Sequence, residues 1–151
     1  MRYNRIFIIF LLAVGLVILA APRPAPAQND MEKLQYMLER SMARQAPLAS
    51  DDIRTYLKYV DPIYRLRFEP DRQTEVIREI NFWDENRFAY VTTKMAVGMS
   101  LLLRPDDSRN KSIPNFARPT PAELTMIKTY QDELGKAMES MQTKYAGGGL
   151  S

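Results

Sequence analysis

The stretch that decides the fold spans residues 120–145 and reads TPAELTMIKTYQDELGKAMESMQTKY. Thr120, Pro121 and Glu123 form a capping box with proline at the first helical position, which is typical of a helix start. Apolar residues then recur at alternating steps of three and four, with Gln131 as the one polar interruption. They are Leu124, Ile127, Leu134, Met138, Met141 and Tyr145. The pattern predicts a long helix whose apolar face packs against other helices.

The same kinds of signal predict four earlier helices. Capping residues, prolines and apolar periodicity delimit them. They run over about residues 30–45, from Ser50 to Pro62, over 71–82 and from Asp84 to about Arg104. Pro62 either ends its helix or kinks it. Within the last of these helices, Gly98 either marks a close helix crossing or is simply tolerated, at a cost of about 1 kcal/mol relative to alanine.

Residues 105–119 form a long connection that is rich in Pro, Asp, Ser and Asn. Connections of this length are typically functional or mobile, whereas Ile113 and Phe116 would pin this one to the core in a purely structural alternative. No segment has the setting of a strand. The sequence therefore predicts an all-α fold, an antiparallel bundle of about four to five helices after an N-terminal signal peptide.

The N-terminal residues have the order of a secretory signal peptide. Arg2 and Arg5 precede an apolar run over residues 6–21, and small residues in Ala25-Pro26-Ala27 form a cleavage site. The run holds 16 residues, fewer than the roughly 20 that cross a bilayer, so a retained anchor is the weaker alternative. We expect a signal peptide over 1–27, a helical bundle domain over 28–146 and a flexible tail over 147–151. The product is expected to be exported, either periplasmic or extracellular, without stable membrane insertion after cleavage.

Composition excludes several classes of function. Once Arg2, Arg5 and Arg23 leave with the signal peptide, the chain carries 18 basic and 18 acidic residues. This balance, without a basic cluster, argues against nucleic acid as a ligand. The chain has no cysteine and no histidine, which excludes disulfides and the usual zinc, haem and imidazole-based catalytic sites. We expect no cofactor, no metal site and no catalytic residues.

The densest polar and aromatic part of the chain contains the candidate binding site, Trp83, Asp84, Arg87, Tyr90 and Lys94. The last three lie at steps of three and four, so they share one helix face that differs from the apolar one. Two cations that flank a phenol suit a carboxylate or a phosphate, and tryptophan and arginine are typical anchors of interfaces. The structural alternative is a solvated face on which Asp84 and Arg87 form an ordinary ion pair.

Methionine is enriched, with eight besides Met1, and several are paired at helical spacing. The pairs are Met95 with Met99 and Met138 with Met141. Thioethers are soft ligands that suit Cu(I), but methionine is also a common filler of helical cores. A third interpretation is that the methionines form an adaptable groove for partner proteins.

These features favour an exported, non-enzymatic helical-bundle protein that acts through protein–protein interaction in the cell envelope. It would serve as an adaptor, an assembly factor or a chaperone-like module, with a protein partner that the sequence does not identify. The alternative is a periplasmic protein that binds a small anionic ligand or Cu(I). An exposed apolar groove would favour the first function, and an enclosed pocket lined by Arg87, Tyr90 and Lys94 would favour the second.

The first prediction concerns the N-terminus of the exported protein. Because Ala25-Pro26-Ala27 has the form of a cleavage site, we expect the mature chain to begin at Gln28 and to be recovered from the soluble extracytoplasmic fraction. Intact-mass measurement checks this. A protein that keeps Met1 and is found in the membrane fraction would contradict the prediction.

Overall fold

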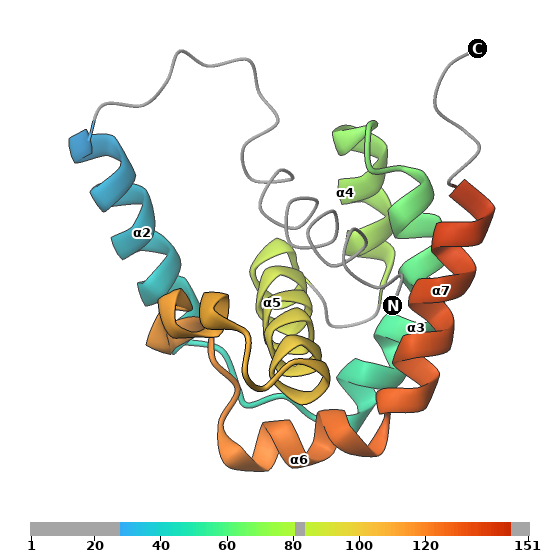
Figure 1. The fold of residues 1–151 in the computed structure, drawn as a ribbon. Coiled ribbons are helices and arrows are strands. Elements are labelled where there is room, and N and C mark those ends of the chain that lie inside the picture. Colours follow the sequence, from blue (N-terminus) through green and yellow to red (C-terminus); the bar gives the residue numbers. More distant parts are fainter. Residues whose placement is uncertain (1–27, 81–83, 146–151) are drawn as a thin grey trace.

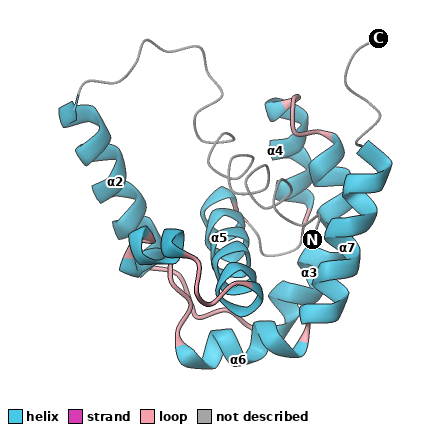
Figure 2. Cartoon of the chain, in the orientation of Figure 1, coloured by secondary structure: helices cyan, strands magenta, loops and turns pink. Residues whose placement is uncertain are grey.

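The computed structural model describes residues 28–80 and 84–145, and within them it contains six α-helices, two 3-10 helices and no strand (Figure 2). The α-helices are α2 (Gln28–Ala43), α3 (Ser50–Arg65), α4 (Pro70–Glu79), α5 (Glu85–Leu103), α6 (Pro121–Thr129) and α7 (Gln131–Tyr145), and the 3-10 helices are η1 (Ser108–Ser112) and η2 (Asn115–Ala117). The all-helical prediction is confirmed, but the expected number of four to five helices is wrong. The signal peptide over 1–27, the tail over 147–151 and Trp83 lie outside the described residues.

The additional helix arises because the predicted helix over residues 120–145 is two helices, separated at Tyr130. Its start is as predicted: Thr120 Oγ1 accepts from the Glu123 backbone N–H at 3.2 Å, and Glu123 Oε2 accepts from the Thr120 N–H at 2.8 Å. The chain changes direction at Tyr130, so that α6 packs against α5 and α7 packs along α3 (Figure 1). A single straight helix would not reach both neighbours.

Helix α5 is the centre of the fold. It contacts α2, α3, α4, α6 and η2, and its start is fixed by Asp84, whose side chain accepts from the Arg87 N–H at 2.7 Å as the capping pattern predicts. Around it the other helices run in different directions, with α6 lying across one end (Figure 1). This arrangement does not confirm the antiparallel bundle.

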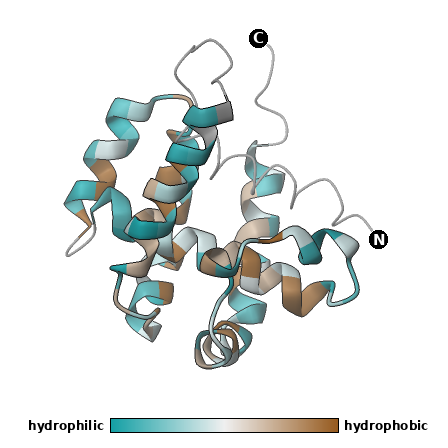
Figure 3. Cartoon of the chain, turned by 90° about the vertical axis from the view of Figure 1, so that its left-hand side faces the viewer, coloured by the Kyte–Doolittle hydropathy of each residue, from teal (hydrophilic) through white to brown (hydrophobic). Residues whose placement is uncertain are grey.

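The core combines apolar side chains from most of the helices. Ile53 of α3, Val91 of α5 and Ile127 of α6 have no exposed surface. Leu134 and Met141, from the predicted apolar face of the last helix, are also buried. Hydrophobic and hydrophilic residues alternate along the helices (Figure 3), as expected for amphipathic helices around a shared core. Among the described residues, no helix has the length and apolar character required to cross a membrane.

Gly98 marks a close crossing of α5 and α6, one of the two alternatives that the sequence left open. A Cβ atom added at this glycine would lie 2.5 Å from Ile127 Cδ1 and 3.4 Å from Pro119 Cγ. Because real Cβ atoms do not approach other carbons to 2.5 Å, a larger residue would force the Ile127 side chain, or the helix that carries it, to shift.

The connection over residues 105–119 is held in place mainly by polar side chains. Buried Asn110 donates from Nδ2 to the Arg104 carbonyl at 2.6 Å. The guanidinium of Arg118 donates to the carbonyls of Ile113 and Asn110. Phe116 packs against the core. The connection is therefore pinned, but apolar residues are only part of the reason.

Both boundaries of α3 differ from the predicted ones. Ser50 is the first residue of α3 and not its cap; the cap is Ala49, whose N–H donates to Asp52 Oδ2 at 2.8 Å. Pro62 does not end α3, which continues to Arg65. Asp52 thus supplies the half of a capping box in which the third helical residue accepts from the N–H of the cap, while alanine has no side chain to supply the other half.

The second prediction tests the core position of the last helix. Leu134 is 2% exposed, so Leu134→Ala should lower the free energy of unfolding by about 2–5 kcal/mol through lost contacts and a cavity. The matched control is Leu103→Ala, which removes a leucine that is 46% exposed and should change the stability by less than about 0.5 kcal/mol. Chemical denaturation measures both. Equal effects of the two substitutions would show that Leu134 does not lie in the core.

Candidate functional site

The predicted polar face of α5 lies inside the protein. Tyr90 and Lys94 are each 6% exposed, and the Arg87 side chain is 13% exposed. The structure therefore brings together three of the predicted site residues, with Asp84 at the start of the same helix. The solvated-face alternative is wrong, because these side chains are turned toward other segments of the chain.

Arg87 ties the start of α3 and the loop before it to α5. Its guanidinium donates from Nη2 to Asp52 Oδ2 at 2.5 Å and from Nε to Asp52 Oδ1 at 3.3 Å. The same group also donates to the carbonyls of Ala46 at 2.5 Å and Pro47 at 3.1 Å. The predicted ion pair with Asp84 is replaced by this network, because the Asp84 carboxylate caps the backbone of α5. The forked, planar guanidinium suits several acceptors at once.

The Tyr90 hydroxyl donates to a buried carboxylate, that of Glu123, which the sequence did not indicate as a site residue. Glu123, 2% exposed, accepts from the Tyr90 hydroxyl at 2.6 Å and from the Leu48 N–H at 2.8 Å through Oε1, and from the Thr120 N–H through Oε2. Burial alone would raise the pKa of Glu123, but these hydrogen bonds and the Lys94 charge hold it below its ordinary value. Burial and the bond to Glu123 raise the pKa of Tyr90.

Lys94 binds the connection that follows α5. Its Nζ donates to the carbonyls of Phe116 at 3.0 Å and Arg118 at 2.5 Å. Burial lowers the pKa of Lys94, and the nearby Glu123 opposes that effect. The ammonium also lies 5.3 Å from the centre of the Tyr90 ring, and the Arg87 guanidinium lies 5.1 Å from it. Two cations do flank a phenol, as the spacing predicts.

The hydrogen-bonding groups of this cluster are used within the protein. The two cations bind backbone carbonyls and Asp52, and Tyr90 binds Glu123. These contacts give Arg87, Tyr90 and Lys94 a structural role. Binding of a ligand or partner by this face stays a prediction, and Trp83, which the prediction includes, lies outside the described residues.

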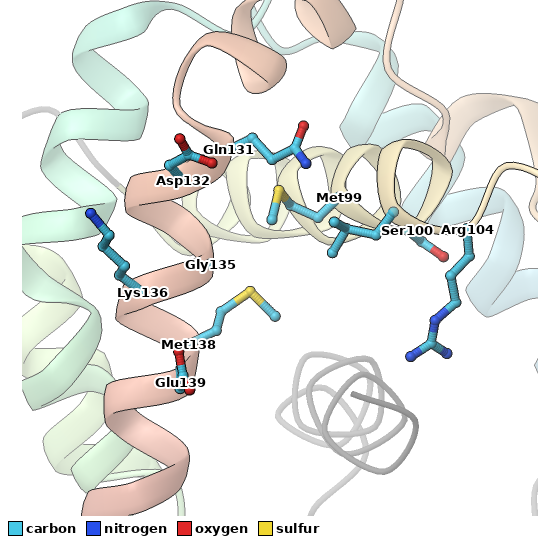
Figure 4. A pocket seen from close by; sticks show the side chains of 10 residues that line it. Met99, Ser100, Arg104, Gln131, Asp132, Gly135, Lys136, Met138 and Glu139 are labelled. Carbon is cyan, nitrogen blue, oxygen red and sulfur yellow. The ribbon is translucent and has the colours of Figure 1, made fainter. Parts of the chain in front are cut away.

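A second candidate site lies between the C-terminal half of α5 and the first half of α7. It is an open hollow of about 390 Å³ with a mainly apolar lining, which we call the α5–α7 groove (Figure 4). Its lining residues are Met99, Ser100, Leu103, Arg104, Gln131, Asp132, Gly135, Lys136, Met138 and Glu139. Met138 extends from α7 into the space between the two helices, and Met99 lies on the α5 side (Figure 4).

Gly135 keeps the α5–α7 groove open. It lies in the interior of α7, and none of the described residues comes within 4 Å of a Cβ atom built on it. A glycine inside a helix costs about 1 kcal/mol relative to alanine, and here no close packing compensates that cost, in contrast to Gly98. This glycine within an amphipathic pattern was the signal through which the sequence could have revealed the groove.

No cluster of potential metal ligands accompanies these two sites in the described part of the chain. Residues 28–80 and 84–145 contain no group of three or more acidic, histidine or cysteine side chains that could hold a metal ion. No protein-family model, no curated protein and no solved structure matches this chain.

The third prediction concerns Glu123. Glu123→Gln replaces one carboxylate oxygen with an amide N–H₂ group, which cannot accept a hydrogen bond. At least one of the three donors therefore loses its acceptor, and the free energy of unfolding should fall by about 1–3 kcal/mol at neutral pH. Because folding lowers the pKa of Glu123, its stabilising effect is complete above the unfolded pKa and is lost as the pH falls through the folded one. The difference between the two proteins should therefore shrink in acid.

Glu133→Gln is the matched control, because Glu133 is an exposed glutamate on the neighbouring helix. It should change the stability by less than about 0.5 kcal/mol. Denaturation curves over a series of pH values provide the comparison. Equal stability of Glu123→Gln and the parent at neutral pH would contradict the assigned hydrogen-bond network.

Proposed function

We propose that this protein is an exported, non-enzymatic helical-bundle protein that binds an amphipathic helix of a partner protein in the α5–α7 groove. In the cell envelope it would act as an adaptor, an assembly factor or a chaperone-like module. The observation that carries the proposal is the open apolar groove, at whose α7 wall Gly135 leaves space for an incoming side chain. An exposed apolar surface of this kind is typical of a protein-binding site.

The walls of the groove are held firmly on the sides that face the protein. The middle of α5, from Tyr90 to Met99, is buried apart from Thr93, and Leu134 and Met141 anchor α7 in the core. At the far end of α7, Lys144 and Tyr145 bind Asp61 of α3. A groove between two fixed helices can accept a third helix with little rearrangement, and that lowers the entropic cost of binding.

The methionines suit the groove to more than one partner sequence. Met138 contributes an unbranched, polarizable side chain from α7, and Met99, which is 2% exposed and part of the core, contributes one from α5. Such side chains change rotamer at low cost and repack around different apolar groups. The same two thioethers also support the alternative function, Cu(I) binding, because they are soft ligands on facing helices. The other alternative, a small anion bound by Arg87 and Lys94, has less support because both cations already have acceptors.

The fourth prediction tests docking in the groove. A photo-crosslinking residue at Leu103, on the exposed edge of the groove, should capture a partner protein when the exported protein is illuminated in cells. Gly135→Leu fills the groove and should abolish that product. It should not lower the unfolding midpoint, because leucine is the better helix former and the space beside Gly135 is open.

Two controls distinguish docking in the groove from non-specific capture and from metal binding. The same crosslinker at Arg54, on the exposed surface of α3, should not give the groove product. The double variant Met99→Leu/Met138→Leu keeps apolar volume but removes both sulfurs, so it should retain the product, whereas a Cu(I) site would lose its metal. A groove product that persists in Gly135→Leu, or no protein product from Leu103, would overturn the proposal.

A further inference from the structure

Helix α2 projects from the rest of the fold (Figure 1). Its contacts are mainly with η2 and α5, and Met42, near its C-terminal end, is the one buried side chain among those described in this helix. Tyr36 is 61% exposed and Met37 is 58% exposed. The N-terminal turns of α2 therefore present a helical surface with large apolar side chains that the described part of the chain does not cover.

The exposed surface around Met37 has a regular charge pattern. Lys33 and Arg40 lie seven residues apart, four residues before and three residues after Met37, so all three side chains share one helix face. Both basic residues are exposed, and no hydrogen bond or ion pair of theirs is found among the described residues. Leu34 lies on the other side of Met37 and is half-buried.

The α7 wall of the groove has the opposite charge pattern at the same spacing. Asp132 and Glu139 are also seven residues apart, and Gly135 lies between them. Seven residues of helix span about 10.5 Å in both cases. The two carboxylates are exposed and have no partner in the described structure. Lys136, which also lines the groove, lies between them in the sequence and extends to the side of α7 away from Met138 (Figure 4).

From this match we infer that the occupant of the α5–α7 groove is α2 of a second copy of this chain. Met37 of one molecule enters the space beside Gly135 of the other. Lys33 then lies opposite Asp132, and Arg40 lies opposite Glu139. A side chain seated among four residues of a facing helix is the usual packing of paired helices, and flanking charges select the partner. The inference rests on the proposed function, since it names the partner that the groove binds.

The charge pattern also sets the direction of the incoming helix. With Met37 turned toward Gly135, the basic residues of α2 lie on one flank and Leu34 lies on the other. In a right-handed helix these flanks exchange sides when the helix is reversed. Only the orientation parallel to α7 places the basic flank over Asp132 and Glu139, with Leu34 toward Met99 and Leu103 on α5. Each molecule thus offers one donor helix and one groove, which is a heterologous interface.

Charge reversal tests this interface in the exported protein. We expect concentration-dependent self-association in analytical ultracentrifugation, weakened by added salt. Lys33→Glu/Arg40→Glu and Asp132→Lys/Glu139→Lys should each raise the dissociation constant at least about tenfold. An equimolar mixture of the two variants should associate as the parent does, because α2 of each variant then meets a groove of opposite charge in the other. Arg54→Glu/Lys58→Glu, which makes the same charge change on exposed residues of α3, is the matched control and should have no effect.

The direction of the helix is tested by pairwise rescue. Lys33→Glu should be compensated by Asp132→Lys and not by Glu139→Lys; the reverse result would overturn the parallel orientation. A protein that is monomeric at all concentrations, or whose association ignores both charge reversals, overturns the self-docking inference. If the Leu103 crosslink then still captures a different protein in a Gly135-dependent manner, the proposed function survives; if it captures none, both fail.

Discussion

A buried carboxylate holds three distant parts of this chain together. Glu123 stands at the start of α6 and receives hydrogen bonds from Tyr90 of α5, from Leu48 in the loop before α3, and from the backbone of Thr120. An ionised group with so little exposure is tolerated only when its acceptor sites are filled, since an unpaired buried carboxylate is costly. The positions of α6, of the loop and of α5 are therefore set together, and the other contacts are arranged around this one.

The cations beside Tyr90 extend the same arrangement to the irregular segments. Arg87 binds carbonyls of the loop before α3, and Lys94 binds carbonyls of the connection before α6. Loops that carry unpaired backbone groups need such partners when they are buried. One face of α5 thus provides the polar contacts that hold these segments in place. Arg87, Tyr90 and Lys94 have the composition of a binding site, but their contacts stabilise the fold. The open apolar surface lies in the α5–α7 groove.

The α5–α7 groove is a consequence of the turn at Tyr130. That turn lets α6 cross α5 closely at Gly98 while α7 packs along α3. Near Gly135 the two walls leave a hollow, which a side chain on α7 would otherwise help to fill. The groove and the projecting α2 are both incompletely covered, and their exposed charges are opposite in sign at equal spacing. The helix docking that we propose would join these features with little rearrangement.

The sequence by itself determined the helical class, the caps at Asp84 and Thr120 and the apolar positions such as Leu134, because capping and periodicity are local properties of neighbouring residues. It also placed Arg87, Tyr90 and Lys94 on one face of one helix. Only the tertiary structure decided that this face is buried, that Asp52 and Glu123 are its partners, and that the last helix divides at Tyr130. Those outcomes depend on which segments meet across long separations in sequence. Local spacing carries no information about such contacts, since a free cation and a buried one have the same pattern along the chain.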